Sequence, residues 1–345
     1  MKIILTYPFL TGKGGMETVI KKVLQNTPDS IKMKLFLPGG SEDESWLDGI
    51  NNDNVEIILH NHKNPLAMFL DTFKYIKAEK PNKVITMNNL QILPILMAKK
   101  FVKNMQVISW NHFSLKFTKA NFLLKKCDSF LAISSGICDE LKEMKINPEK
   151  IHLIYNPIDK PTKLIPLGNE NTRRFIYVGR VQYKKQKNLA EMFEILGQLE
   201  FDFQLDIYGD GTKEEVNKLK NLAKMLGINS KINWHGWQKN VWNSIKKTDL
   251  LLFTSKYEGF PMAILEAIAH GIPVISSNCS SGPKDIVTSL NGKLYQLGNT
   301  SEAVKLLNDF YSGNLKFGSQ EEIAKSVEKF YTENYIKDYF NIIQK

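Results

Sequence analysis

Short apolar runs alternate with longer amphipathic stretches along this chain. Runs such as KIILTY, KVITMN and QVISWN in the first half, and FIYVGR, FQLDIYG and DLLLFTS in the second, have the length and composition of buried strands. The stretches between them have helical periodicity and cover residues 16–25, 65–79, 136–144, 189–199, 213–226, 242–247 and 262–270. This alternation predicts the α/β class, with parallel sheets joined by crossover helices.

The alternating pattern occurs twice, and a proline-containing segment separates the two copies. Residues 156–172 (NPIDKPTKLIPLGNENT) hold three prolines and little periodicity, which is typical of a linker. We therefore expect two doubly wound Rossmann-like domains, residues 1–165 and 166–325, facing each other across a cleft. Residues 326–345 are expected to form a helix that returns to the first domain. Ligands of doubly wound sheets bind at the carboxyl ends of the strands, so a site is expected there.

The composition is that of an ordinary globular protein, with 43% hydrophobic and 24% charged residues. The most apolar stretch, LQILPILMA, is too short to span a membrane and is interrupted by Gln and Pro. The first ten residues resemble a strand more than a signal peptide. The three cysteines follow no metal or disulfide pattern, as in proteins of reducing compartments. We expect a cytoplasmic protein.

The net charge of +10 is concentrated in residues 97–126, which contain no acid. This basic segment carries seven lysines and five interleaved aromatic residues: Lys99, Lys100, Lys103, Lys116, Lys119, Lys125, Lys126, Phe101, Trp110, Phe113, Phe117 and Phe122. Such a surface suits an anionic membrane or an anionic acceptor. No nucleic-acid-binding motif accompanies it, so no nucleic acid partner is expected. We expect this segment to contact the inner face of the cell membrane peripherally. The alternative is that it is only a solvated lysine-rich face.

A glycine-rich turn follows the first expected strand. Gly12 and Gly14 begin a dinucleotide fingerprint, but Glu17 occupies the third glycine position and the second strand ends without an acid. NAD binding is therefore poorly supported. Gly14 and Gly15 can still bring backbone N–H groups close to an anionic ligand at a helix N-terminus. An ordinary strand–helix turn is the alternative.

The second half opens with FIYVGRVQYKKQKNL, which places Arg180 directly after a strand. The chain has only three arginines, and this one precedes Lys184, Lys185 and Lys187. A guanidinium fork together with an ammonium point charge suits a diphosphate. A solvated surface is the alternative. Gly209, at the end of a later strand, either allows a ligand to approach the backbone or forms a simple turn.

Two glutamates flank an apolar run in SKYEGFPMAILEAIAHG. Glu258 precedes the turn formed by Gly259, Phe260 and Pro261, and Glu266 lies inside a helix predicted to begin at the proline and end at a glycine. A loop acid and a helix acid can reach one ligand from two directions. Two solvated glutamates are the alternative.

The remaining candidates are histidines. His112 follows an expected strand and is either a ligand contact or an ordinary core or surface residue. His60 and His62 are two positions apart with no further ligand near them in the sequence, so no metal site is expected there. The chain also lacks an Asp-x-Asp pair, a Walker loop, a Gly-x-Ser-x-Gly elbow and a Cys-x-x-Cys pair. We expect neither a metal nor a cofactor.

Several motifs in this order resemble one family over nearly the whole chain. They are GGMET, AISSGICDEL, IYNPID, YVGRVQYKKQKNL, YGDG, WHGW and SKYEGFPMAILEA. The chain resembles the large retaining glycosyltransferase family four, of glycosyltransferase-B fold. The details QKN and SSGPKDIV are most similar to bacterial lipopolysaccharide galactosyltransferases and to capsule or exopolysaccharide glycosyltransferases.

This resemblance implies a metal-independent hexosyltransferase that retains anomeric configuration. The expected donor is a nucleoside diphosphate sugar, UDP-hexose by preference, and it is a substrate rather than a cofactor. The expected acceptor is a saccharide or lipid-linked glycan in bacterial surface polysaccharide synthesis. A nucleotide-sugar epimerase of the same architecture and a non-catalytic carbohydrate- or membrane-binding module are the alternatives.

The resemblance also implies roles for individual residues. Glu258 would lie beside the donor sugar, with the turn at Gly259 near the sugar and phosphate, and Glu266 would accept hydrogen bonds from the ribose. Arg180 and Lys187 would hold the diphosphate with help from the turn at Gly15. His112 would contact the donor sugar near the reacting carbon. The family's lysine commonly lies closer to the arginine, so Lys185 is an alternative to Lys187.

Overall fold

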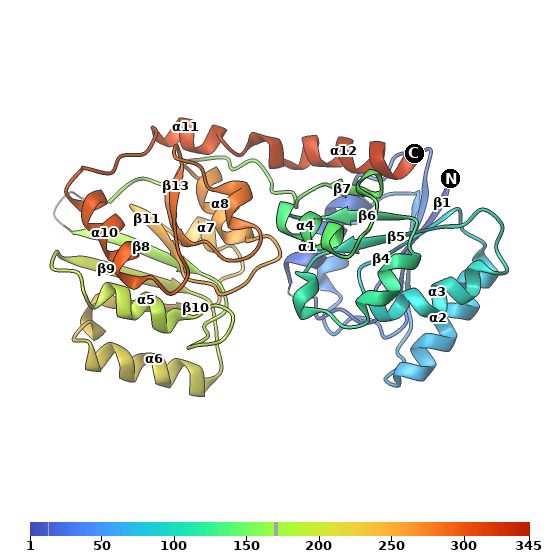
Figure 1. Cartoon of the computed structure of the whole chain (residues 1–345), viewed down its shortest axis with the longest axis horizontal. Coiled ribbons are helices and arrows are strands. Elements are labelled where there is room, and N and C mark those ends of the chain that lie inside the picture. Colours follow the sequence, from blue (N-terminus) through green and yellow to red (C-terminus); the bar gives the residue numbers. More distant parts are fainter. Residues whose placement is uncertain (13, 169–171) are drawn as a thin grey trace. The chain divides into compact units, whose positions relative to one another are not determined.

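The computed structural model describes residues 1–12, 14–168 and 172–345, which contacts divide into two units (Figure 1). Unit 1 is Met1–Pro157 with Thr332–Lys345, and unit 2 is Ile158–Tyr331. From the sequence, the divisions were expected at 165/166 and 325/326. The difference at the linker has a physical reason: the Ile165 N–H donates to the His270 carbonyl at 3.0 Å, which ties this stretch to unit 2. Linker residues 169–171 lie outside the described residues.

Unit 1 is built on a parallel sheet of seven strands in the order β3-β2-β1-β4-β5-β6-β7. The strands are β1 (Lys2–Thr6), β2 (Lys32–Leu37), β3 (Val55–Leu59), β4 (Lys83–Thr86), β5 (Gln106–Asn111), β6 (Ser129–Ala132) and β7 (Ile151–Leu153). The chain runs outward from β1 to one edge and then returns to build the other half. This is the doubly wound order predicted from the alternating pattern.

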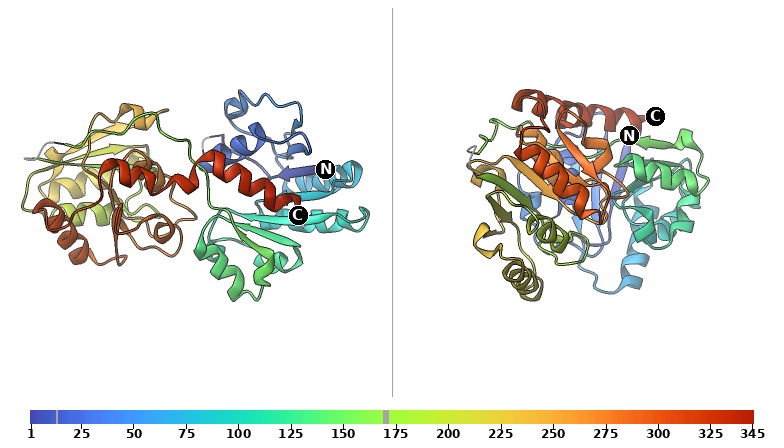
Figure 2. Two further views of the ribbon diagram at one scale, coloured as in Figure 1. Left: turned by 90° about the horizontal axis from the view of Figure 1, so that it is seen from above. Right: turned by 60° about the vertical axis from the view of Figure 1, so that its left-hand side comes forward.

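The helices of unit 1 are α1 (Gly15–Gln25), α2 (Pro65–Glu79), α3 (Ile92–Lys99), α4 (Ser135–Glu143) and α12 (Thr332–Gln344). Shorter 3₁₀ turns are η1 (Ser45–Leu47), η2 (Asn89–Gln91), η3 (Leu115–Phe117), η4 (Asn121–Lys126) and η5 (Pro148–Lys150). The final helix, α12, packs against α1, and the Tyr339 ring lies 5.1 Å from that of Trp110. Both chain ends bond to Ser30, the amino group to its carbonyl at 2.8 Å and Gln344 to its hydroxyl at 3.1 Å. The two ends accordingly lie near each other in both views of Figure 2.

Helix α3 is absent from the helices expected from the sequence. It is apolar nearly all round, so no period distinguishes it from a buried strand. Pro94 lies in its first turn, where a proline costs no hydrogen bond. Within the described ranges, none of the helices is long and apolar enough to cross a membrane.

Unit 2 repeats the same winding with six parallel strands in the order β10-β9-β8-β11-β12-β13. The strands are β8 (Arg173–Val178), β9 (Phe203–Tyr208), β10 (Ile232–Gly236), β11 (Leu250–Phe253), β12 (Val274–Ser277) and β13 (Gly292–Tyr295). The helices are α5 (Leu189–Leu196), α6 (Lys213–Met225), α7 (Val241–Ser244), α8 (Met262–Ala269), α9 (Pro283–Ile286), α10 (Thr300–Tyr311) and α11 (Gln320–Lys325), with 3₁₀ turns η6 (Asn229–Lys231) and η7 (Glu328–Phe330).

Helices cover both faces of this second sheet (Figure 1). Helix α5 packs against α6 and α10 on one face, while α8 packs against α9 and α11 on the other. The central strands are therefore buried on both sides, and Phe175, Ile176 and Tyr177 of β8 have no exposed surface. Because all strands are parallel, the loops after β8, β9 and β11 leave the sheet at the same edge.

Candidate active site

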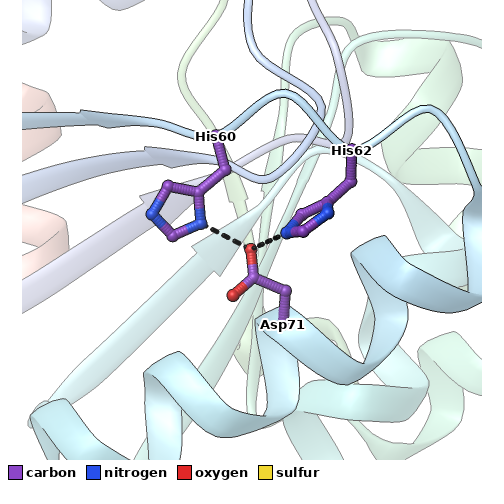
Figure 3. A group of neighbouring side chains, drawn as sticks. All are labelled: His60, His62 and Asp71. Atoms are coloured by element: carbon purple, nitrogen blue, oxygen red, sulfur yellow. Dashed lines mark hydrogen bonds and ion pairs between the residues drawn. The ribbon is translucent and has the colours of Figure 1, made fainter.

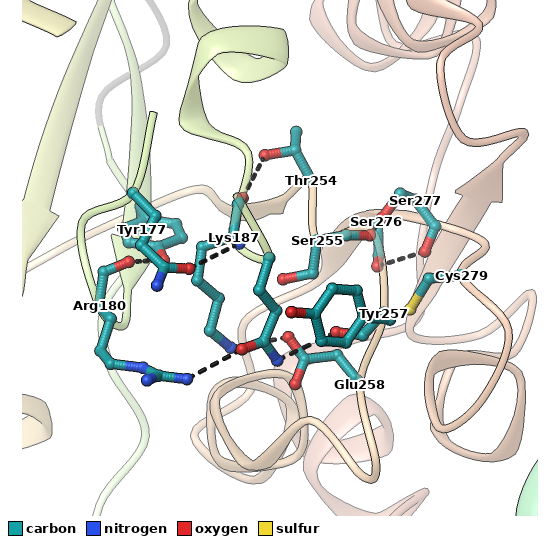
Figure 4. Close-up of polar contacts among 12 residues, drawn as sticks. Tyr177, Arg180, Lys187, Thr254, Ser255, Tyr257, Glu258, Ser276, Ser277 and Cys279 are labelled. Carbon is teal, nitrogen blue, oxygen red and sulfur yellow. Dashed lines mark hydrogen bonds and ion pairs between the residues drawn. The ribbon is translucent and has the colours of Figure 1, made fainter. Parts of the chain in front are cut away.

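The loops that follow β8 and β11 bring a lysine and a glutamate together at the carboxyl edge of the sheet in unit 2 (Figure 4). The Lys187 ammonium lies 2.7 Å from Oε1 of Glu258, and the two side chains are 14% and 8% exposed. An ion pair this sheltered keeps much of its Coulomb energy because little water screens it. The structure thus joins two of the four residues, Glu258, His112, Arg180 and Lys187, that the resemblance implies act at the reacting sugar and the diphosphate.

Lys187 is fixed along its whole length. Its ammonium lies 5.1 Å from the centroid of the Phe253 ring, a cation–π contact. Its backbone N–H donates to the Gln182 side chain at 3.1 Å. The Thr254 hydroxyl donates to the carbonyls of Lys187 and Asn188, at 3.3 and 3.1 Å. The charge is therefore positioned before any ligand arrives.

Glu258 begins a tight turn that leads into α8. The Ser281 hydroxyl donates to the Glu258 carbonyl oxygen. Gly282, at φ +94°, packs so closely on this turn that an added Cβ would lie 2.4 Å from Cδ of Pro261. A side chain at this position would push the turn out of place. The loop around Gly282 therefore holds Glu258 in position.

The predicted donor-binding residues Gly259, Phe260 and Pro261 all lie in this turn. The Phe260 side chain is buried, and its ring lies 5.5 Å from that of Phe330. It can therefore present only its backbone to a ligand. Pro261 is the N-cap of α8 rather than its first residue, one position outside the predicted start.

Arg180 follows β8 and is exposed. Its guanidinium donates to Oε1 of Gln186 at 2.9 Å, and Nε2 of Gln186 donates to the Tyr257 carbonyl at 3.1 Å. The Tyr177 hydroxyl donates to the Arg180 carbonyl at 2.7 Å. Gln186 thus connects the arginine to the loop that carries Glu258. Gln186 opens the motif QKN, but nothing in the sequence indicated its role, because that role depends on a contact with a residue 71 positions away.

Lys185, the alternative to Lys187, points to a different acid. Its ammonium lies 3.2 Å from Oε1 of Glu215, and its side chain is 67% exposed. Of the two lysines, only Lys187 lies beside Glu258.

Gly209, after β9, approaches the neighbouring loop closely, since an added Cβ would lie 1.9 Å from the Gly179 carbonyl oxygen. Backbone packing alone therefore requires a glycine at this position.

Glu266 lies on α8 among different neighbours from those of Glu258. The Trp242 indole N–H donates to its Oε2 at 2.9 Å. The Trp242 ring stacks on that of His270 with 5.0 Å between centroids. The sequence placed Trp242 on a helix but gave it no role, because nothing local showed that it faces Glu266.

His112 and Asn111 line a cavity of about 240 Å³ in unit 1. The cavity lies at the carboxyl ends of β1, β4 and β5, and its other lining residues are Tyr7, Met87, Asn88, Asn89, Leu90, Phe113, Thr118 and Lys119. Both side chains are only 6% exposed, and within the described residues Nε2 of His112 and Oδ1 of Asn111 have no hydrogen-bond partner. Burial lowers the pKa of His112 to about 3, so the imidazole is neutral at physiological pH. Two buried polar atoms without a partner, on residues that line a cavity, are suited to a polar ligand.

The Gly14–Gly15 turn is occupied by a side chain of its own helix. Gly14 is the N-cap of α1, and the Glu17 carboxylate accepts from the Gly12 N–H at 3.0 Å and from the Thr11 hydroxyl at 3.3 Å. A buried acid therefore lies where an anionic ligand was expected to meet the helix. Gly15 itself is exposed. Lys13 of this turn lies outside the described residues.

The fold brings a third side chain to His60 and His62 that their sequence neighbourhood did not indicate. Asp71 of α2 lies between them, a neighbour that the sequence separates from the pair by nine residues or more. Within the described residues, His60, His62 and Asp71 form a group whose ligand atoms lie close enough together to hold one metal ion. It belongs to unit 1 and contains none of the residues around Glu258.

Two family models cover the chain. Residues 161–334 match "Glycosyl transferases group 1", and residues 13–160 match "Glycosyltransferase Family 4". The lipopolysaccharide 1,6-galactosyltransferase of Salmonella typhimurium is 34% identical, with 99% of this chain and 98% of that protein covered. The enzyme of the same name from Escherichia coli has the same identity and coverage.

A solved structure is similar along the full length. The lipopolysaccharide outer core galactosyltransferase WaaB is 33% identical and superposes with a TM-score of 0.89 over 100% of this chain and 99% of that one. The predicted family and the predicted pair of Rossmann-like domains are confirmed by these similarities. The chain therefore belongs to the family-four, group 1 glycosyltransferases and is a glycosyltransferase of the glycosyltransferase-B fold.

Proposed function

We propose that this glycosyltransferase moves a hexose, galactose by preference, from a UDP-sugar to a sugar of a lipid-linked glycan during bacterial surface polysaccharide synthesis. The choice of galactose and of a lipopolysaccharide-type acceptor is supported by the full-length relatives, which are lipopolysaccharide 1,6-galactosyltransferases. The structural observation that carries the proposal is the sheltered Lys187–Glu258 pair, with Arg180 connected to the same loop.

Arg180 and Lys187 are proposed to bind the donor diphosphate. The exposed guanidinium offers a planar fork, and the fixed ammonium offers a point charge. On donor binding, Lys187 would share its charge between Glu258 and a phosphate oxygen. These two cations supply the positive charge that a metal ion supplies in other sugar transferases, so the proposed reaction needs no metal and no cofactor.

In the proposed reaction, the acceptor hydroxyl oxygen forms a bond to the anomeric carbon. The bond from that carbon to the diphosphate oxygen breaks, and its electron pair leaves with the diphosphate. The acceptor proton passes to the departing phosphate oxygen, and attack on the leaving-group face retains the configuration. Fixed cations next to the charge that develops stabilise the transition state, a contribution commonly of several kcal/mol.

Glu258, Glu266 and His112 are proposed to recognise the donor. Glu258 lies in the turn before α8, beside the phosphate-binding lysine, and is placed to accept from a sugar hydroxyl. Glu266, held by Trp242, would accept from the ribose. The neutral imidazole of His112 can bond a sugar hydroxyl without adding charge, and its unpartnered Nε2 supports this role.

We also propose that the enzyme works at the inner face of the cytoplasmic membrane, through the basic segment of residues 97–126. Trp110 of this segment is buried and cannot contact lipid. Phe101, Phe113, Phe117 and Phe122 are 51–71% exposed, which suits insertion at an interface. Six of the seven lysines are exposed, and the seventh, Lys99, pairs with Asp128 at 2.5 Å.

The direct test is a screen of donors and acceptors. Purified enzyme is incubated with UDP-galactose, UDP-glucose and UDP-N-acetylhexosamines, each with and without a truncated lipopolysaccharide acceptor. NMR of the product then gives the sugar, the linkage and the anomeric configuration. We expect an α-linked hexose that appears only with acceptor. Formation of an epimer without acceptor would indicate an epimerase, and the absence of any turnover would indicate a binding module.

A further inference from the structure

Two histidines and an aspartate meet at the carboxyl end of β3 in unit 1 (Figure 3). Oδ2 of Asp71 lies 2.6 Å from Nδ1 of His60 and 3.3 Å from Nε2 of His62. The three nitrogen and oxygen atoms lie within 4.8 Å of one another. We propose that this trio is a binding site for a divalent transition-metal ion, zinc being the best fit.

The local fold brings the three side chains together. Residues i and i+2 of an extended segment point to the same side, which directs both histidines at α2. The backbone N–H groups of His60 and His62 donate to the carbonyls of Leu37 and Pro38, at 3.0 and 3.1 Å. The ring of His60 also meets that of Phe36 edge-on, with 5.4 Å between centroids. The histidines are therefore fixed by the neighbouring strand β2.

Asp71 is fixed separately by its helix. Helix α2 begins after Asn64, whose side chain accepts from the Leu66 N–H at 2.8 Å, and Pro65 follows at the first helical position. The carboxylate lies on the second turn of a helix whose start is well defined. Ligands on two independently anchored elements form a preorganised site.

The ligand atoms define the kind of ion. Two imidazole nitrogens and one carboxylate oxygen are typical of zinc and related metals, whereas magnesium and calcium prefer oxygen alone. Tetrahedral zinc with bonds of about 2.0–2.1 Å holds its ligand atoms ~3.3 Å apart. The separation of Asp71 from His62 already has this value, whereas that from His60, 2.6 Å, must widen when the ion binds.

An ion can reach the trio from solvent. The side chains of His60, His62 and Asp71 are 40%, 42% and 19% exposed. Three protein ligands leave a fourth position for water or another small ligand, as in open zinc sites. The cysteines that often compete for zinc, Cys127, Cys138 and Cys279, are all buried. A bound ion would tie the end of β3 to α2 and so stabilise unit 1, apart from any step at Glu258.

The test uses the full chain, freed of metal with a chelator and then titrated with zinc chloride by calorimetry. We expect one ion per chain, together with a melting temperature for unit 1 that rises with zinc concentration by mass action. Acidification should weaken binding, because only neutral imidazoles coordinate. His62→Ala and Asp71→Asn each remove one ligand, and both should lower the affinity by more than an order of magnitude.

A matched control is available in unit 2. Nε2 of His235 lies 2.7 Å from Oδ1 of Asp206, a similar pair without a second histidine. His235→Ala should leave the zinc stoichiometry and affinity unchanged. The proposal is overturned if wild type takes up no zinc, or if His62→Ala binds it as tightly as wild type. If Asp71→Asn is less stable but wild type binds no zinc, the three side chains only hold β3 and α2 together through hydrogen bonds.

Discussion

The ammonium group of Lys187 forms an ion pair of 2.7 Å with the carboxylate of Glu258, although 71 positions separate the two residues in the chain. Both groups are sheltered, and Lys187 is held against the ring of Phe253 as well. The fold has therefore fixed a positive charge next to an acid at the edge of the sheet where doubly wound proteins bind ligands.

Removing the charge of Lys187 should cost both stability and turnover. Lys187→Met leaves the Glu258 carboxylate buried without its partner, which should destabilise unit 2 by about 3 kcal/mol. In the double variant Lys187→Met/Glu258→Gln both charges are gone, so most of this stability should return while turnover stays lost. Chemical denaturation and steady-state kinetics measure the two effects. Lys185→Met, which removes an exposed lysine, is the control and should change stability little. Near-normal turnover of the double variant would contradict the assigned roles.

The two acids should affect different kinetic constants. Glu266→Ala removes a proposed ground-state contact and should raise KM for the donor about tenfold, as for one hydrogen bond to a charged group. Trp242→Phe, which loses only the N–H that holds Glu266, should shift KM in the same direction by less. Glu258→Gln should chiefly lower kcat, because its contact strengthens as the sugar reacts. Equal effects of Glu258→Gln and Glu266→Ala, confined to KM, would rule out this division.

Burial of His112 should make unit 1 sensitive to acid. The pKa of His112 is lowered to about 3 in the folded protein, whereas an unfolded histidine titrates near ~6.5. Between these values the unfolded chain binds a proton that the folded chain does not, so stability falls as pH falls from about 6.5 toward 3. At pH 5 the loss from this group is about 2 kcal/mol. His112→Gln should show a correspondingly smaller decrease in unfolding free energy between pH 7 and pH 5. A wild-type decrease no larger than that of the variant would show that His112 is not the cause.

The basic segment should bind anionic membranes in a salt-sensitive way. Each lysine near an anionic leaflet contributes roughly 1 kcal/mol, and this attraction is screened within a Debye length. Vesicles that contain phosphatidylglycerol should co-sediment the protein at low salt, and neutral vesicles should not. Exchange of Lys116, Lys119, Lys125 and Lys126 for Gln should release it, whereas exchange of the unit 2 lysines Lys220 and Lys224 should not. If wild type fails to bind anionic vesicles at low salt, the segment is a solvated face.

The fold could be predicted from the sequence because the pattern that identifies each strand and each helix lies within that element. Each strand of a doubly wound sheet is a short apolar run, and each crossover helix has its own period. The exception, α3, is apolar on nearly every side and has no period to detect. The contacts divide the chain at Pro157/Ile158 rather than at the expected 165/166, because a hydrogen bond ties Ile165 to unit 2.

The site was harder to predict because its partners are distant in the chain. Arg180, Lys187 and Glu258 were recognised from their motifs. The bridge through Gln186, the bond from Trp242 to Glu266 and the place of Asp71 between two histidines depend on which loops meet in space. The choice between Lys185 and Lys187 also needed the structure, since both lie in one lysine-rich stretch and only one faces Glu258.

We expect protein cations, not a metal ion, to stabilise the departing diphosphate during transfer to an acceptor. The most direct test is the rate of UDP release in excess EDTA, with and without acceptor, for wild type and Arg180→Lys at a temperature where both are folded. We predict that wild type releases UDP only with acceptor and that its rate is unchanged by EDTA, even after zinc has been removed from the His60 trio. Arg180→Lys should be slowed by more than an order of magnitude, because a point charge cannot replace the guanidinium fork. Loss of wild-type activity in EDTA, restored by added Mg²⁺ or Mn²⁺, would contradict the account.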